Sequence, residues 1–218
     1  MGSQFGGETV SWSNMSMDEF QAALASSTPT PGGGTASALA LAQAAALSVM
    51  VSKLTLGNDR WSEGWAVAQE VQSLSVPMMN RANVLADDDS DAFDRVMEGF
   101  GLPKETQEEK DLRRSAIRAA TLMAAAVPFE TAELGLELLE LLPELARNGN
   151  ANAASDVGVA GLLASAAAKG AVFNVEINLD SLPSDMGRDF RDRLPELKER
   201  IRAQSRNVMD AVRERMLG

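Results

Sequence analysis

The 218-residue sequence contains no cysteine, no histidine and no tyrosine. Without cysteine the chain cannot form a disulfide and has no thiolate to act as a nucleophile. Without histidine it lacks the commonest general base, the commonest metal ligand and every Ser-His or Cys-His nucleophile pair. Any catalysis by this chain must therefore use carboxylates, amides, hydroxyls, lysine or the backbone.

Aromatic residues are also scarce, at 5% of the chain, although hydrophobic residues make up 45% and are mostly alanine and leucine. Ala and Leu favour helices, whereas β-branched and aromatic residues favour strands. The composition therefore predicts an all-α protein, and the length is sufficient for a single domain.

Positive charge is in deficit, with 20 Lys and Arg against 31 Asp and Glu and a formal net charge of −11. Such a surface is a poor partner for nucleic acid. The first residues have neither the basic segment nor the apolar core of a signal peptide, so we expect a cytoplasmic protein.

One segment, residues 35–56, is apolar and would span about 33 Å as a helix, which is long enough to cross a bilayer. It is interrupted by Gln43, Ser48, Ser52 and Lys53. We therefore expect a buried helix of a soluble bundle here and no membrane association.

The chain is expected to have a flexible leader, residues 1–15, and one helical domain, residues 16–218. Ser16 with Glu19, and Thr106 with Glu109, have the spacing of a capping box at a helix start. Helices are expected over residues 16–27, 35–56, 63–87, 88–100, 106–127, 129–146, 155–171 and from 184 onward. The third and fourth could be continuous, Pro128 could either kink a helix or open one, and residues 172–185 could be extended or helical. The simplest architecture is an up-and-down bundle, whose small residues suit dimerisation through helices.

Residues 29–35, "PTPGGGT", lead directly into the long apolar helix. The first turn of a helix has unpaired N–H groups and a partial positive charge, and glycines let a ligand approach them closely. No Gly-Lys-Ser/Thr follows, as in a Walker A loop, and no strand precedes it, as in a dinucleotide fingerprint. From the residues alone, a structural corner and a ligand loop are equally good interpretations.

Residues 147–156, "RNGNANAASD", form a second polar corner. Asn150 and Asn152 provide amide donors and acceptors, and Asp156 would lie one turn into the following helix on the same face. Helix starts favour Asn and Asp, so a simple cap is one interpretation. Three asparagines, a serine and an aspartate exceed what one cap needs, which favours a site. A third polar group, at residues 174–178, would begin about 27 Å from Asp156 on a straight helix.

A run of aspartates, Asp87 to Asp89 and Asp91, is a solvated surface in the simplest interpretation. Crowding of like charges can nevertheless raise one carboxyl pKa into the range that suits general acid–base catalysis. No ligand loop with regular spacing surrounds the run, so we expect no metal site.

Five segments stand in one order along the chain: "SMDEFQAALASSTPTPGGGTASALALAQAAALSVMVSKLT", "DDDSDAFDRVM", "LPKETQEEK", "AAAVPFETA" and "GNANAASDVGVAGLLASAAAKGAVFNVEINL". Together they extend over about residues 16–182, and their joint pattern resembles the formiminotransferase-cyclodeaminase/cyclohydrolase family. The resemblance implies an all-α bundle that dimerises and acts on one-carbon units carried by tetrahydrofolate. One branch closes 5-formiminotetrahydrofolate to the 5,10-methenyl form and releases ammonia. A free-standing branch hydrolyses 5,10-methenyltetrahydrofolate to 10-formyltetrahydrofolate.

The chain has no room for a formiminotransferase domain, so it looks more like the free-standing cyclohydrolase branch. Two positions depart from the family pattern. Relatives often carry Lys where this sequence has Asn58, and a small residue where it has Gln43. If that Lys touches substrate, Arg60 or Lys53 must take its role, and either change could mark a subgroup with another substrate.

The resulting hypothesis is a methenyltetrahydrofolate cyclohydrolase with no permanently bound cofactor and no metal. The methenyl bridge is a cation, which one carboxylate can stabilise while another takes a proton from the attacking water. The candidate catalytic residues are Asp156 and Asp89. The candidate substrate-binding residues are Thr30, Gly32, Gly33, Gly34, Thr35, Lys53, Arg60, Asn150, Asn152 and Ser155.

With the resemblance, residues 30–35 become a ligand loop that takes a carboxylate of the substrate tail. This loop and the Asn/Asp corner must then meet across neighbouring helices or across a dimer interface. The expected partners are a folate substrate and a second copy of the chain. The alternatives are a cyclodeaminase, and a non-catalytic helical dimer that binds an anionic metabolite, which the Asn58 departure favours.

Overall fold

The computed structural model describes residues 11–217 of the chain. Within these residues it contains six α-helices, three short 3-10 helices and no strand. The helices are η1 (Trp12–Asn14), α1 (Met17–Leu24), α2 (Gly33–Leu56), η2 (Asp59–Gly64), α3 (Trp65–Gly101), α4 (Gln107–Asn148), η3 (Ala151–Ala153), α5 (Ala154–Asp180) and α6 (Arg188–Leu217). The prediction of an all-α protein is confirmed.

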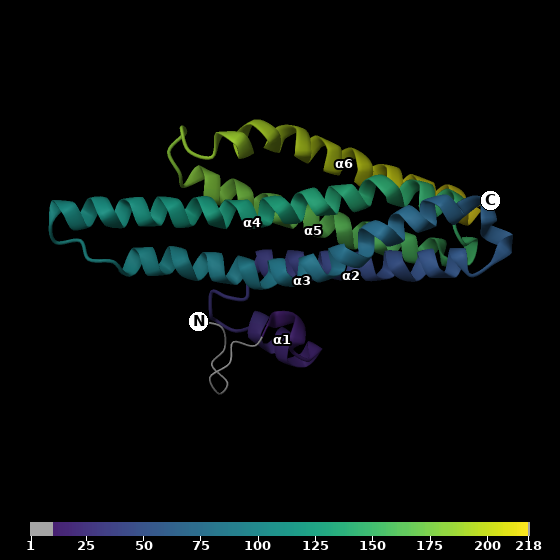
Figure 1. Cartoon of the computed structure of the whole chain (residues 1–218), viewed down its shortest axis with the longest axis horizontal. Helices are drawn as coiled ribbons and strands as arrows, with labels where there is room; N and C mark the ends of the chain where they lie inside the picture. Colours follow the sequence, from purple (N-terminus) through teal and green to yellow (C-terminus); the bar gives the residue numbers. More distant parts are fainter. Residues whose placement is uncertain (1–10, 218) are drawn as a thin grey trace.

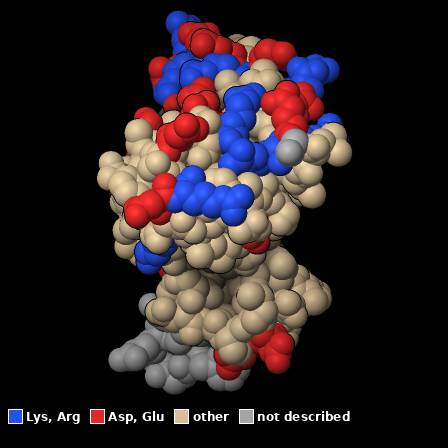
Figure 2. Space-filling model, turned by 90° about the vertical axis from the view of Figure 1, so that its right-hand side faces the viewer, with Lys and Arg blue, Asp and Glu red and all other residues tan. Residues whose placement is uncertain are grey.

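The long helices α2 to α6 run up and down along one axis, and α1 lies apart from them, below α2 and α3 in the view of Figure 1. The last part of α3 and the first part of α4 project beyond the ends of the other helices. Viewed from the right-hand end of Figure 1, charged side chains of both signs gather toward α6, and the surface toward α1 carries few of them (Figure 2).

The core of the bundle is built mainly from alanine and leucine. Leu41 of α2, Leu139 of α4 and Ala164 of α5 are all fully buried, and burying one leucine side chain stabilises the fold by about 1.5–3 kcal/mol. Small residues let the helices approach closely: a Cβ added to Gly135 of α4 would lie 2.9 Å from the Cβ of Ala168. Alanine therefore favours this bundle in two ways: it has a high helix propensity, and its small side chain lets neighbouring helices pack closely.

The helix starts follow the sequence signals. Ser16 and Glu19 form a capping box at α1, and Thr106 and Glu109 form one at α4. The two expected helices before residue 100 are one helix, α3, with Pro77 inside it. Residues 107–148 are likewise one helix, α4, because the packing around its two prolines outweighs the hydrogen bonds that they remove.

Residues 172–180 continue α5 as a helix, so Asp156 and Asn174 stand on one unbroken element. Residues 11–15, which the sequence assigned to the flexible leader, lie against α3, with Trp12 buried. The remaining ten residues of that leader lie outside the described part of the chain.

Two helices, α2 and η3–α5, are long and apolar enough to cross a membrane when judged by length and composition alone. Core helices of soluble proteins pass the same test. Here α2 and α5 pack against each other, and α5 also packs against α4 and α6.

Candidate functional site

Four helices enclose a pocket of about 490 Å³, which is within the usual size range of small-molecule sites. The start of α2 and the C-terminal part of α3 form one side, and residues of α4 and α5 form the other. Its walls are mixed, with aromatic and aliphatic side chains beside a few polar groups. The lining residues are Pro29, Thr30, Gly32, Gly33, Gly34, Asp89, Phe93, Val96, Phe100, Ile117, Arg118, Thr121, Ala124, Asn174, Ile177, Asn178, Ser181 and Leu182.

Asp89 is the acidic residue of this pocket. Its carboxylate accepts a hydrogen bond from the Thr35 hydroxyl at 3.2 Å and another from the Thr35 backbone amide. Burial raises the pKa of Asp89 above its usual value, and the hydrogen bonds from Thr35 oppose that rise only in part. A half-buried carboxyl with a raised pKa beside a pocket suits general acid–base catalysis.

The geometry of the pocket explains why residue 34, at the start of α2, is a glycine. A Cβ on Gly34 would lie 2.1 Å from Oδ1 of Asp89, so only glycine leaves room for this carboxylate at the start of α2. The helix has no side-chain cap of its own at Gly32. The anion that meets its first turn is therefore Asp89, where the sequence interpretation placed a carboxylate of the substrate tail.

The opposite wall of the pocket carries one cation and two amides. Arg118 of α4 is exposed, and none of the ion pairs among residues 11–217 involves it. The side-chain amides of Asn174 and Asn178 donate to the carbonyls of Gly170 and Ala124, at 2.9 and 2.8 Å. Each of these donations fixes the side chain and leaves its oxygen as an acceptor.

The structure thus brings together part of the predicted site. Thr30, Gly32, Gly33 and Gly34 line the pocket with Asp89, and Thr35 binds Asp89. The other predicted residues lie at the opposite end of α2, about 36 Å away by the length of a 24-residue helix. They are Lys53, Arg60, Asn150, Asn152, Ser155 and Asp156. Within one chain the two groups do not share a pocket.

At that far end, the polar groups of the second corner make contacts within the fold. Asn150 accepts from the Asn152 amide at 3.0 Å, and its own amide nitrogens donate to Leu54 and Thr55 of α2. Asn58 accepts from the Arg60 backbone amide at 3.0 Å and so caps η2. The two donations from Asn150 tie the loop before α5 to the end of α2.

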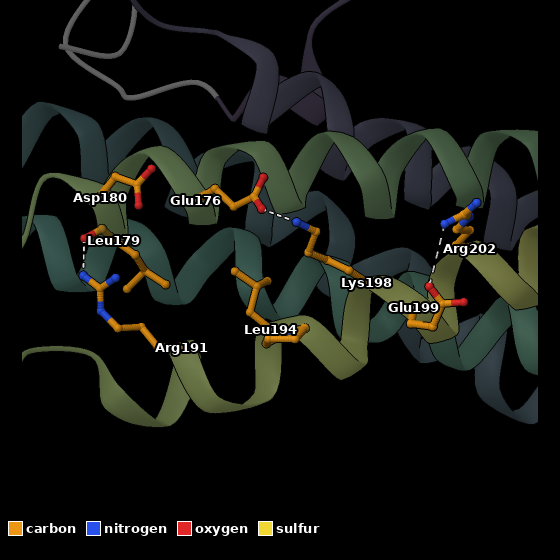
Figure 3. A pocket seen from close by; sticks show the side chains of 9 residues that line it. Glu176, Leu179, Asp180, Arg191, Leu194, Lys198, Glu199 and Arg202 are labelled. Carbon is orange, nitrogen blue, oxygen red and sulfur yellow. Dashed lines mark hydrogen bonds and ion pairs between the residues drawn. The ribbon is translucent and has the colours of Figure 1, made fainter. Parts of the chain in front are cut away.

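A larger hollow, of about 850 Å³, lies between α5 and α6 (Figure 3). Five of its six charged side chains are engaged with one another or with the backbone: Lys198 with Glu176, Arg202 with Glu199, and Arg191 with the Leu179 carbonyl. It contains none of the predicted site residues. In the described part of the chain no group of three or more acidic side chains is arranged to hold a metal ion.

Comparison with known proteins identifies the family of this chain. A family model described as formiminotransferase-cyclodeaminase matches residues 16–196. The chain belongs to this family. One member, methenyltetrahydrofolate cyclohydrolase of Methylorubrum extorquens, is 39% identical over 78% of this chain and 81% of its own length.

Other members of the family are longer or are known as structures. Formimidoyltransferase-cyclodeaminase of Sus scrofa is 32% identical over 78% of this chain, which corresponds to 31% of its own length. The crystal structure of formiminotetrahydrofolate cyclodeaminase from Thermotoga maritima superposes with a TM-score of 0.78 at 29% identity. That comparison covers 94% of this chain and 98% of the other.

Arg118, Asn174 and Asn178 line the pocket but are not among the site residues that the sequence predicts. The two asparagines stood out as a third polar group, but nothing indicated that the end of α5 would lie beside the start of α2. Arg118 had no signal, because it is one of several arginines on α4. Only the packing of four helices identifies it as a pocket residue.

Proposed function

We propose that this protein hydrolyses 5,10-methenyltetrahydrofolate to 10-formyltetrahydrofolate. The observation that carries the proposal is a half-buried carboxylate, Asp89, at a pocket large enough for a folate. The 39% identity to a methenyltetrahydrofolate cyclohydrolase over most of both chains supports the choice of reaction. The methenyl bridge is a cation, and a carboxylate in a partly desolvated pocket attracts it strongly.

In the proposed reaction, Asp89 accepts a proton as a water molecule attacks the methenyl carbon. The new C–O bond gives a tetrahedral intermediate that carries a hydroxyl. The C–N5 bond then breaks as this hydroxyl loses its proton to solvent and becomes the formyl carbonyl, and the proton on Asp89 passes to N5. The reaction consumes one water and releases one proton overall. Because a raised carboxyl pKa makes a better proton acceptor, the burial of Asp89 supports this role.

We assign the acidic tail of the substrate to Arg118. A tail carboxylate beside the start of α2 would approach Asp89 and be repelled, whereas Arg118 on the opposite wall has the complementary charge. The apolar lining, including Phe93 and Phe100, suits the flat rings of the folate. The oxygens of Asn174 and Asn178 can accept hydrogen bonds from the pterin N–H groups.

We also propose that the protein is a homodimer, formed through α2 and α5. Large apolar side chains on these two helices are exposed in the single chain: Met50, Leu54, Val159, Leu162, Phe173 and Ile177. The four on α5 lie within about 60° around the helix. A surface about 36 Å long and two helices wide approaches the roughly 800 Å² per partner of a standard interface. Lys53 is the only charged residue of α2, so two chains of net charge −11 can meet here with little repulsion.

The apolar row reaches the pocket, because Ile177 also lines it. A second copy on this surface would therefore complete a wall of the site. In a symmetric dimer that reverses the helix direction, the corner with Asn152 and Asp156 of one copy lies near the Gly33 corner of the other. This arrangement unites the two halves of the sequence prediction, and we place such a dimer in the cytoplasm.

The second candidate function is that of a formiminotetrahydrofolate cyclodeaminase. It is favoured by the TM-score of 0.78 to the Thermotoga maritima enzyme over nearly the whole of both chains. The two reactions share the 5,10-methenyl compound, as product in one and substrate in the other. Ammonia release from 5-formiminotetrahydrofolate distinguishes them.

The test of the main proposal is the decay of 5,10-methenyltetrahydrofolate absorbance with and without protein. We expect wild type to accelerate the decay and Asp89→Asn to lose at least about 100-fold of that rate while remaining folded. Asp91→Asn, an exposed aspartate of the same helix, is the matched control. Wild-type protein without activity above the buffer rate would refute the function, and full activity of Asp89→Asn would refute the role of Asp89.

The dimer is tested separately with Leu162→Asp, which places a charge on the exposed row of α5. We expect a monomer of unchanged helix content by light scattering and circular dichroism. Leu112→Asp changes an equally exposed leucine on α4 and should leave the mass unchanged. If Leu162→Asp keeps the wild-type mass, the proposed interface is wrong.

A further inference from the structure

The segment before α1, residues 11–15, is held firmly against α3. The Ser11 hydroxyl donates to Asp87 at 2.5 Å, and the Trp12 backbone amide donates to the same carboxylate at 2.8 Å. Trp12 is 6% exposed, and its ring packs edge-on against Phe20, with the ring centroids 6.5 Å apart. A tryptophan so fixed can orient groups that its ring nitrogen reaches.

A chain of hydrogen bonds leads from this ring to the pocket carboxylate. Trp12 Nε1 donates to Ser90 Oγ at 2.9 Å, Ser90 Oγ lies 3.0 Å from Thr35 Oγ1, and Thr35 Oγ1 donates to Asp89 at 3.2 Å. Thr35 is fully buried and Ser90 nearly so, so water does not compete for these hydroxyls.

The indole fixes the direction of this chain. An indole nitrogen can only donate, whereas each hydroxyl has one hydrogen to give. Thr35 gives its hydrogen to Asp89, so the hydrogen between Ser90 and Thr35 comes from Ser90, which itself accepts from Trp12. Every hydrogen therefore points toward the carboxylate, an arrangement that favours its ionised form.

We propose that Trp12 is a positioning residue for Asp89: through Ser90 and Thr35 it keeps a hydroxyl donor aimed at the carboxylate, and so holds it ionised and in place. This inference rests on the proposed role of Asp89 as the base. Trp12, in the segment before α1, would then affect the reaction through Asp89 without touching the substrate. No pairing of residue types in the sequence indicates this link, since the members lie on three separate elements.

The hydroxyl chain is the main partner of Asp89 whose loss can change the pKa of its carboxyl, because the charged groups nearby on α3 are bound to other residues. On its own helix, Asp87 is bound by residues 11 and 12, and Asp88 pairs with Arg81 at 3.1 Å. On α4, Arg118 lines the pocket and is the cation that faces it. The lining residues of α5 are uncharged, and α2 contributes only backbone amides and Thr35 near the pocket. Burial raises the pKa of Asp89 and the Thr35 bonds lower it, so loss of these bonds must raise the pKa further.

The experiment compares Trp12→Phe, which keeps an aromatic ring and removes the N–H, with Trp65→Phe. Trp65 Nε1 also donates a hydrogen bond, to the Thr55 carbonyl at 3.1 Å, but at the far end of α2. We expect Trp12→Phe to move the acidic limb of the kcat/KM profile to higher pH by about 0.5–1 unit, with little change in the plateau. Trp65→Phe should leave the profile unchanged. Ser90→Ala breaks the chain at its middle and should give the same displacement even if Trp12→Phe folds poorly.

A second readout does not depend on activity. The 13C resonance of the Asp89 carboxyl, assigned by its loss in Asp89→Asn, is titrated in wild type, Trp12→Phe and Ser90→Ala. We expect the midpoint to rise in both variants. An unchanged midpoint in folded Trp12→Phe and Ser90→Ala overturns the inference. A raised midpoint with an unmoved kcat/KM profile shows that the chain tunes a carboxyl that is not the base, which overturns the positioning role together with the proposed mechanism.

Discussion

Replacing Gly34 by alanine tests the arrangement of the pocket with a single methyl group. The added Cβ would lie 2.1 Å from Oδ1 of Asp89 and 2.5 Å from both Cγ and Oδ2. An ordinary contact begins near 3.4 Å, so the carboxylate must move by about 1.3 Å. Such a shift breaks the 3.2 Å bond from Thr35.

The expected effect on turnover is large and the effect on folding is small. Misplacing a reacting group by about 1 Å can cost about 100-fold in rate, so Gly34→Ala should lose at least that much in kcat. Loss of the hydrogen bond to the half-buried Asp89 carboxylate should destabilise the fold by about 1–3 kcal/mol, whereas alanine restores up to about 1 kcal/mol through its higher helix propensity. The melting temperature should therefore fall by less than about 8 °C for a chain of this size.

The assay is methenyltetrahydrofolate absorbance decay, with thermal melting followed by circular dichroism. Gly101→Ala is the matched control, because a Cβ there meets nothing within 4 Å. In an Asp89→Asn background the added methyl group should cost little further activity, since the displaced group is already inactive. If Gly34→Ala retained kcat within about threefold of wild type, the view that Gly34 exists to admit a working Asp89 would be refuted.

Two more predictions concern the charged groups of the pocket. Arg118→Ala should raise KM about 10-fold or more and leave kcat nearly unchanged, because a contact to the remote tail of the substrate is made equally in the ground state and the transition state. The control in the same steady-state assay is Arg114→Ala, because Arg114 pairs with the exposed Asp111. For stability, a carboxyl whose folded pKa is raised favours folding below its unfolded pKa and loses that contribution as pH rises through the folded pKa. Because burial raises the pKa of Asp89 from 3.8, the melting temperature of Asp89→Asn relative to wild type should increase as pH rises from about 4 toward neutral, and a constant or decreasing difference would contradict this.

The sequence predicted the helices well, and some of its candidate site residues line one pocket. Capping boxes at Ser16 and Thr106, and the breakers around Gly57 and Gly149, act within a few residues, so they can be located without tertiary information. The glycine corner and Asp89 were selected together and lie together. The sequence predicts that these glycines admit a ligand, whereas in the structure Gly34 leaves room for the carboxylate of Asp89.

The sequence alone determined the helical class, the exclusion of imidazole and thiol chemistry, and the family resemblance, because these depend on composition and local order. Only the tertiary structure decided which polar groups meet. Helix packing set Arg118 and Asn178 opposite Asp89, joined Trp12 to it through two hydroxyls, and left the Asp156 corner at the other end of α2. These distances depend on how rigid rods of 24 to 42 residues cross, which no short stretch of sequence encodes.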